Sequence, residues 1–334
     1  MLKIIHAPDG LERFCQTPPM LNLQSVIRQK ADAHLLLENQ PGQVTARCSL
    51  WWKNTPAYEN YAPGLIGNYS ASEAEAGKDL LQQACAMLAS HGCTMAVGPM
   101  DGNTWNRYRL ITERGDHPLF FLEPDNADDL PQHFLANGFS MLAEYFSTIT
   151  DDLKVRDPRM EIVAEKMKSL GVKIRSIQPE NFLSELAGIY EISLAAFQNN
   201  FLYTPLEKAD FIVQYEQIKN FVRPELIFIA EHENRAVGFL FALPDLAQAQ
   251  RGEAVDAFIV KTVAVLPEPE FAGLGSLLVA RSHEIGASLG FTRAIHALMH
   301  ETNKSRSISQ HYSQQLRRYA LFEKELSNAE ARTQ

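Results

Sequence analysis

The stretch "VAVLPEPEFAGLGSLLVARSHEIGASLG", residues 263–290, sets the expectation for the fold. A run rich in β-branched residues comes first, and a loop with Gly273 and Gly275 follows it. Apolar residues then recur at near-helical spacing, at Leu274, Leu278, Ile285 and Leu289. A strand, a glycine loop and a helix start predict an anion site, because the first N–H groups of a helix have no partner within it.

Composition predicts two domains and excludes some classes of partner. The chain has 334 residues, of which 46% are hydrophobic and 21% charged, enough for two separate cores. The formal net charge is −9, and the only short basic cluster is Arg317-Arg318, so nucleic acid is not an expected partner. The longest apolar runs fall far short of the roughly 20 residues that cross a membrane. The first ten residues do not read as a signal peptide, so a cytoplasmic protein without a membrane partner is expected.

Motifs for metal, disulfide and nucleotide chemistry fail at specific positions. The dinucleotide pattern G-x-G-x-x-G has Leu278 at its third glycine, and the zinc pattern H-E-x-x-H ends at Ala287. No C-x-x-C pair occurs, and no metal site is predicted. Reduced thiols that fill core space are expected at Cys15, Cys48, Cys85 and Cys93.

Two segments far apart in the chain resemble each other. Residues 76–92, "AGKDLLQQACAMLASHG", and residues 272–290 both begin with Ala-Gly, continue with Leu-Leu and end with a glycine that suits a helix C-cap. This similarity predicts a duplicated domain. The first copy reads Gly77-Lys78-Asp79 where the second has Gly-Leu-Gly. We expect the Asp79 carboxylate to repel a phosphate there, so the first copy is not expected to bind one.

The order of elements predicts an α/β (α+β) fold of two tandem domains. Each domain is expected to hold a mixed, mostly antiparallel, twisted sheet flanked by helices. The boundary is placed near Asp157-Pro158, with domains at residues 1–155 and 156–334. For the second half the expected order is a strand at 172–177, helices at 184–198 and 205–221, a hairpin at 225–243, a strand at 257–266, the glycine loop and helix, a strand at 293–299, a helix opening at 301–303, and a strand at 316–326.

This order resembles the GNAT superfamily of acyl-CoA-dependent N-acyltransferases. The loop of that family, [Q/R]-x-x-G-x-[G/A], matches residues 270–275, with Glu270 standing where the family prefers Gln or Arg. Asn303 matches the family's Asn at the start of the next helix. The resemblance covers most of residues 172–326, and residues 1–150 resemble a degenerate second copy. The whole chain is therefore similar to a tandem GNAT protein.

The resemblance implies an N-acetyltransferase. Acetyl-CoA would be the co-substrate, and the amine of a small-molecule or amino-acid-like acceptor would attack its thioester directly. In the family a Tyr often protonates the departing thiolate. Tyr312 is the nearest Tyr, but the usual spacing falls nearer Gln310, so Tyr312 is either that acid or a packing residue. Expected cofactor contacts are Val263, Ala264, Val265, Phe271, Ala272, Gly273, Leu274, Gly275, Ser276 and Asn303.

Several points stay open in the sequence. No general base is assigned, since His296 and His300 on a predicted strand are more often structural. Phe197 and Tyr203 are expected to wall the acceptor site, whereas Trp105 either lines a pocket or fills a core or interface, the second being favoured. Alternative functions are a non-catalytic acyl-CoA-binding or interaction module and an aminoacyl or long-chain acyl transferase. A homodimer is one alternative for the oligomeric state.

Overall fold

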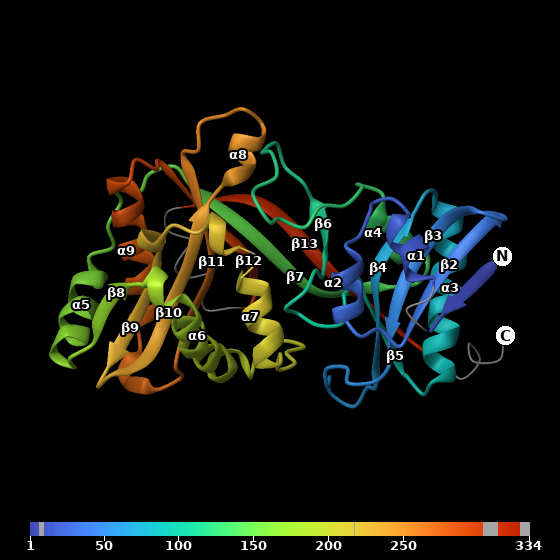
Figure 1. Ribbon diagram of the computed structural model, residues 1–334, viewed down its shortest axis with the longest axis horizontal. Coiled ribbons are helices and arrows are strands. Elements are labelled where there is room, and N and C mark those ends of the chain that lie inside the picture. The colour runs from blue at the N-terminus through green and yellow to red at the C-terminus, as the bar shows by residue number, and fades with distance from the viewer. Residues whose placement is uncertain (7–9, 217, 303–312, 328–334) are drawn as a thin grey trace.

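The computed structural model describes residues 1–6, 10–216, 218–302 and 313–327. The first half of the chain forms β1 (Leu2–Ile5), α1 (Leu11–Gln16), α2 (Leu23–Arg28), β2 (Ala33–Gln40), β3 (Gln43–Trp51), β4 (Pro63–Ala71), α3 (Ala74–Ser90), β5 (Met95–Gly98), β6 (Leu110–Glu113), α4 (Leu130–Ala136) and β7 (Ser140–Thr150). In the first half, β2 and β3 form an antiparallel hairpin (Figure 1).

The second half begins with α5 (Arg159–Ser169), which follows the predicted boundary. Its further elements are β8 (Lys173–Ser176), α6 (Phe182–Phe197), α7 (Lys208–Glu216), β9 (Ile227–His232), β10 (Arg235–Pro244), α8 (Leu246–Gln250), β11 (Ala257–Val265), α9 (Leu274–Ser288), β12 (Arg293–His300) and β13 (Gln314–Glu325). Short 3₁₀ turns lie at Pro179–Asn181, Lys219–Phe221, Pro224–Leu226 and Pro269–Phe271. The helix expected to open at 301–303 falls mostly outside the described residues.

The strands form a mostly antiparallel sheet with helices packed against it, as the sequence predicted, but the sheets of the two halves join into one continuous sheet. Its order is β1-β2-β3-β4-β5-β13-β7-β12-β11-β10-β9-β8, with β6 paired to β13. Two pairs are parallel, β4 with β5 and β11 with β12. Each parallel pair is joined by one long helix, α3 or α9, as a crossover connection requires. The two halves therefore repeat the same unit of strands and helix.

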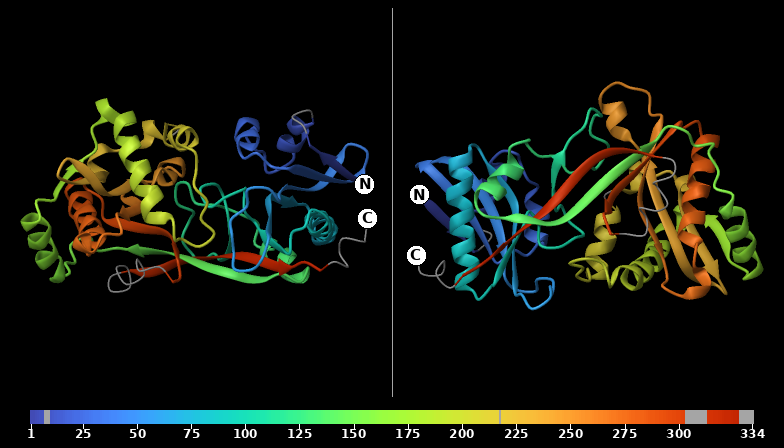
Figure 2. Two further views of the ribbon diagram at one scale, coloured as in Figure 1. Left: turned by 90° about the horizontal axis from the view of Figure 1, so that it is seen from below. Right: turned by 180° about the vertical axis from the view of Figure 1, so that it is seen from behind.

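The two halves exchange their last strands. β13, from the end of the chain, pairs with β5 of the first half through Phe322↔Gly98 and Glu325↔Met95. β7, from the first half, pairs with β12 of the second half through Ala294↔Thr150. β7 and β13 also pair with each other, and Figures 1 and 2 show them crossing the middle of the molecule together. A division at residue 155 stays a proposal, and each half of the sheet includes a strand from the other half.

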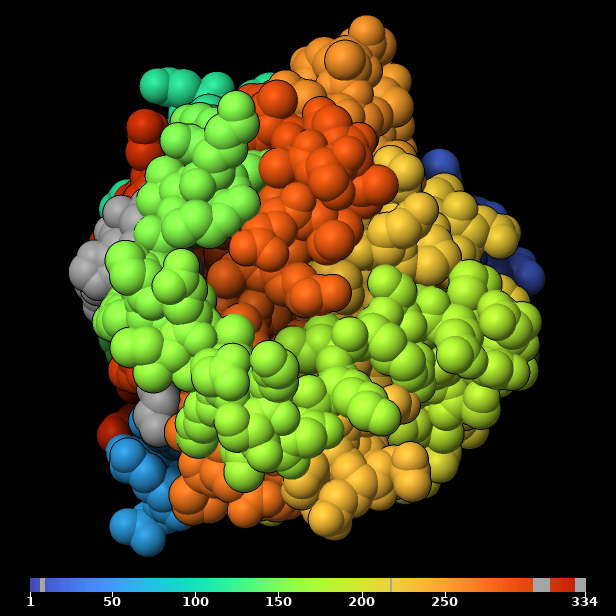
Figure 3. All heavy atoms as spheres, turned by 90° about the vertical axis from the view of Figure 1, so that its left-hand side faces the viewer, coloured from blue at the N-terminus to red at the C-terminus, as the bar shows by residue number. Residues whose placement is uncertain are grey.

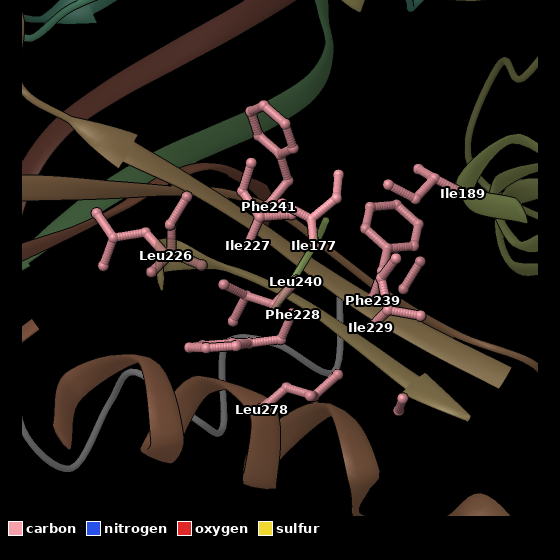
Figure 4. Close-up of a cluster of buried hydrophobic side chains, with 14 of the residues drawn as sticks. Ile177, Ile189, Leu226, Ile227, Phe228, Ile229, Phe239, Leu240, Phe241 and Leu278 are labelled. Carbon is pink, nitrogen blue, oxygen red and sulfur yellow. The ribbon is translucent and has the colours of Figure 1, made fainter. Parts of the chain in front are cut away.

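The larger core lies in the second half. Phe228, Phe239 and Leu240 on the β9–β10 hairpin are at most 2% exposed and pack near Leu278 of α9 (Figure 4). A separate core in the first half packs α3 on its sheet, with Leu80, Leu81 and Leu88 fully buried. All four cysteines are buried, as the sequence predicted, and none of them forms a disulfide bond.

An ion pair is buried where the exchanged strands meet. The Nε atom of Arg317 on β13 lies 2.8 Å from the Oε1 atom of Glu123, and both side chains are fully buried. The hydroxyl of Tyr319 also donates to that carboxylate, and Ser147 of β7 is 3.0 Å from the same hydroxyl. The amide of Leu298 on β12 donates to the Ser147 hydroxyl at 3.0 Å. A chain of polar contacts thus links the two exchanged strands to β12.

Candidate functional site

Two parallel strands part in the second half. β11 and β12 pair from Ala257↔Arg293 to Val260↔His296. Past this point β11 stays paired with β10, whereas β12 pairs with β7 as far as His300↔Tyr145. A register shift between His296 and Met299, with φ of 58° at Leu298, marks the divergence. Within the described residues, positions 261–265 of β11 have no pairing with β12.

The predicted cofactor residues gather at this parting. Val263, Ala264 and Val265 lie along the unpaired stretch of β11, and α9 begins above them. A Cβ built on Gly275 would lie 3.7 Å from a methyl of Val263 and 3.8 Å from one of Val265. The start of the helix therefore sits directly over the parted strand.

The glycine loop leaves the start of α9 open. Gly273 is the N-cap residue with φ of 94°, and no side chain caps the helix. Phe271 and Leu274 are buried and hold the loop in place, while Ala272 is exposed. The first helical N–H groups, including those of Gly275 and Ser276, have no partner within the helix. They supply partial positive charge at the mouth of the parting.

Helix α5 contacts this loop, which the sequence did not predict. A Cβ on Gly273 would come within 3.1 Å of both Val163 methyls, and the Lys166 ammonium lies 3.4 Å from the Ala272 carbonyl oxygen. The lysine adds a full positive charge beside the helix start.

A groove of about 800 Å³ runs between α5 and α9, visible in Figure 3 as the hollow between the green and orange-red segments. Its floor carries apolar side chains such as Val279, Met160 and Met167. Charged side chains of both signs line it too, including Arg281 and Glu284. The groove reaches the first turn of α9 at Ser276, so it opens next to the uncapped helix start.

The first half lacks such an opening. The Met100 amide donates to the Ile66 carbonyl at 2.8 Å, and the Asn68 amide donates to the Asp101 carboxylate at 2.6 Å. These bonds bridge β4 and the chain that follows β5. Gly67 lies against that chain so closely that a Cβ there would be 2.3 Å from the Met100 carbonyl oxygen. No extended ligand fits between strands joined in this way.

The structure corrects the sequence comparison of the two loops. Gly77 is the fourth residue of α3, so it does not correspond to Gly273, which precedes α9. Asp79 lies in the second turn of α3, so its charge is not at the helix start. The first half fails to offer an anion site because only two residues separate β4 from α3, and because its strands are bridged.

The remaining predicted residues are scattered. Asn303 and Tyr312, and with Tyr312 the assignment of the acid, lie outside the described residues. Trp105 lies between the halves, with ring centroids 6.1 Å from Phe197 and 6.0 Å from Tyr203. Its indole N–H donates to the Thr204 carbonyl at 3.0 Å, which supports the interface interpretation.

The two histidines of β12 occupy different environments. His296 is buried on the α9 side, where its Nε2 is 3.0 Å from that of His283. Burial lowers the pKa of His283 to about 4 and that of His296 to about 3. His300 lies past the parting, its ring 4.9 Å from Tyr145, and its Nδ1 accepts from the Thr302 amide at 3.2 Å. Burial also lowers the pKa of His300.

Sequence reasoning missed Lys261 altogether. It stands on β11 where the strands part, it is exposed to solvent, and the surrounding protein nevertheless lowers the pKa of its ammonium by desolvation. The one signal in the sequence is a charged residue in the middle of an otherwise apolar strand, "FIVKTVAV".

Among the described residues no group of three or more His, Cys, Asp or Glu could hold a metal ion. In the same part of the chain, every helix is too short or too polar to cross a membrane.

Comparison with known proteins gives one curated relative and many structural neighbours. The chain is 26% identical over 168 residues to protein YghO of Escherichia coli (strain K12), a match that spans 49% of this chain and 42% of that protein. The match thus covers less than half of the relative's length. No family model matches the chain.

Three solved structures show the same fold. One is the GCN5-related glucosamine N-acetyltransferase region of a fungal multi-domain GH3 β-N-acetylglucosaminidase, with a TM-score of 0.55 and 15% identity over 97% of this chain and 38% of that chain. Another is a conserved protein of unknown function, a probable N-acyltransferase, from Enterococcus faecalis V583. Its TM-score is 0.55 and its sequence identity 10%, over 99% of this chain and 73% of that chain. The third is the GCN5-related N-acetyltransferase from Sphaerobacter thermophilus. Its TM-score is 0.50 and its sequence identity 12%, over 97% of this chain and 96% of that chain. These neighbours show that this chain has the fold of GCN5-related N-acetyltransferases, and its repeated strand–helix unit fits two tandem copies of that fold.

Proposed function

We propose that the chain is an acyl-CoA-dependent N-acyltransferase, that acetyl-CoA is its donor, and that only the second half binds it. The observation that carries this proposal is the parting of β11 from β12 beneath the uncapped start of α9. An extended thioester arm needs free backbone groups along a strand, and a pyrophosphate needs N–H donors at a helix start. The second half offers both, whereas in the first half the strands are bridged and the start of α3 carries the carboxylates of Glu73 and Glu75.

The residues at the parting suit each part of that substrate. Backbone groups along Val263–Val265 would bind the arm as an added strand. The N–H groups of Gly275 and Ser276 would hold the phosphates. Lys166, beside the loop, adds a charge of the right sign. Because Gly275 has no side chain, the phosphates can approach the backbone closely.

The chemistry would be direct transfer. The lone pair of the acceptor amine attacks the thioester carbonyl carbon, the carbon–sulfur bond breaks, and the amide forms as CoA thiol leaves. A backbone N–H of the unpaired stretch of β11 would polarise the carbonyl oxygen. The proton from the amine goes to a base or to water, and the thiolate takes up a proton. No described side chain is assigned to either proton transfer.

The test is thermal unfolding with and without acetyl-CoA. Ligand at about 100 times its Kd stabilises a binding-competent fold by about 2.7 kcal/mol, a shift of a few degrees. Gly275→Asp should abolish the shift, because it sets a carboxylate where the phosphates bind. Gly275→Asn has the same size without the charge, so it should keep more of the shift. The space around Gly275 accepts a side chain, so both variants should fold.

Release of CoA thiol in the presence of an amine panel separates transfer from binding alone. Thiol release that depends on an amine, and that Gly275→Asp removes, supports the proposed function. A melting shift without transfer across the panel would favour the non-catalytic alternative. No shift in the wild type would refute the donor site.

A further inference from the structure

Lys261 occupies a β-bulge at the parting. On β10, Phe241 pairs with Thr262 and the next residue, Ala242, pairs with Val260, so Lys261 is an extra residue on β11. A bulge bends the strand and re-aims the side chains beside it. The bulge lies directly after the last pair that joins β11 to β12. Lys261 is therefore the first residue of the unpaired stretch.

The ammonium of Lys261 has no counter-charge among the residues that the structure describes. Elsewhere the structure matches many cations to carboxylates, as in the Arg175–Glu185 pair at 2.8 Å. Within the described residues no oxygen pairs with the Lys261 ammonium. Desolvation alone lowers its pKa, with no contribution from a neighbouring charge. The protein around Lys261 partly dehydrates its ammonium, and a partly dehydrated charge without a partner is costly to maintain.

Neighbouring side chains show on which face of the sheet the Lys261 side chain lies. Val263 and Val265 lie under Gly275, on the α9 face. Thr262 is on the opposite face, because its side chain hydrogen-bonds to the buried hydroxyl of Tyr215 on α7. Ile259, two residues before Lys261, packs with Phe120 away from α9. Strand alternation and the bulge thus place Lys261 with Thr262, facing α7 and away from the start of α9.

Elements of both halves pack on that face of the sheet. Trp105 of the first half packs against the connection between α6 and α7, and its ring lies 5.7 Å from that of Phe211 on α7. The donor, by contrast, would approach from the start of α9. A molecule that reaches Lys261 from the α7 side would meet the donor at the parting. That is the position required of an acceptor.

We propose that Lys261 binds the carboxylate of the acceptor, which is therefore an amine that also carries an anionic group, as an amino acid does. This inference rests on the proposed function and defines its substrate class. A charge-assisted hydrogen bond in a partly dehydrated site is stronger than a neutral one. The bound carboxylate supplies the counter-charge that Lys261 lacks. In the first half the corresponding strand position holds Gly67, pressed against the Met100 carbonyl.

The experiment measures binding without requiring transfer. The probes are N-acetylated amino acids and their matched C-terminal amides, which resemble products and differ in one charge. Each is tested by thermal unfolding and by titration calorimetry with CoA present. We expect carboxylates to bind and amides to bind on the order of 10- to 100-fold more weakly, the size of a hydrogen bond to a charged group. Lys261→Gln should remove this preference and Lys261→Arg should retain part of it.

Lys173→Gln is the control, since it removes one exposed positive charge on the edge strand β8. It should leave the preference unchanged. Equal binding of acids and amides, no binding by any carboxylate, or an unchanged preference in Lys261→Gln would each overturn the proposal. Failure of the proposed function would give a different result. Carboxylates would still be preferred through Lys261, but acetyl-CoA would not stabilise the protein. Acetyl-CoA binding with equal transfer to neutral and acidic amines would overturn the Lys261 proposal alone.

Discussion

Replacing Arg317 by methionine should destabilise the whole protein, because it leaves Glu123 buried without its cation. The two side chains are fully buried and 2.8 Å apart, and the contact is one of charge rather than an aligned hydrogen bond. Removing one partner of such a pair costs about 3–5 kcal/mol. Arg317 also donates to the carbonyls of His117 and Pro118, which would lose these donors.

The assay is equilibrium unfolding in urea followed by circular dichroism. Arg318→Met is the matched control, because this neighbouring arginine is about a third exposed and lies 3.5 Å from Glu144. An exposed pair of this kind contributes at most about 1 kcal/mol. The double variant Arg317→Met with Glu123→Gln should recover part of the loss, since the uncompensated charge is gone.

A loss below about 1 kcal/mol for Arg317→Met would refute the reasoning. So would a loss equal to that of Arg318→Met. Either result would mean that the exchanged strands are held by their backbone pairing and apolar contacts alone. Separate transitions for the two halves in the variant, in place of one, would instead show that the ion pair couples them.

Three further predictions concern stability. Gly273→Ala should cost about 1–3 kcal/mol in thermal unfolding, because of the left-handed φ and the Val163 methyls, whereas Gly275→Ala should be neutral or stabilising by up to about 1 kcal/mol. Gly67→Ala should cost about 3 kcal/mol, because its Cβ would overlap the Met100 carbonyl oxygen. Lowering the pH from 7 to 5 should remove about 2 kcal/mol per buried histidine of the His283–His296 pair. Their folded-state pKa values are depressed, so stability is complete above pH 6.5 and falls towards pH 4; His283→Gln should weaken this dependence in urea titrations at each pH.

Local features of the site could be predicted from the sequence. The glycines at 273 and 275 predict the start of a helix, because the backbone conformation there depends only on residues close by in the chain. The hairpin at 225–243 was likewise confirmed as β9 and β10. The error over Gly77 had a local cause too. The Ala-Gly pair recurs as letters, but in α3 it lies inside the helix, where Gly77 allows close packing on Tyr69 and His133.

Long-range pairing could not be predicted in the same way. Whether β13 pairs with β5 or with a strand of its own half depends on residues more than 200 positions apart, and the alternating pattern of a strand does not name its partner. The bulge at Lys261 depends on the register with β10, which is equally invisible in the sequence. The site thus depends on pairings that composition and periodicity do not encode.

Both halves pair with an exchanged strand, and they differ in what the chain after the last parallel pair bonds to. In the first half β5 is followed by chain that bonds back to β4 through the Met100 amide. In the second half the equivalent chain, at Leu298, bonds to Ser147 of β7 instead, a strand supplied by the other half. Beyond His296, β12 stays paired with β7 and no longer pairs with β11. The first half thus supplies the strand that pairs with β12 beside the gap in which we place the donor and Lys261.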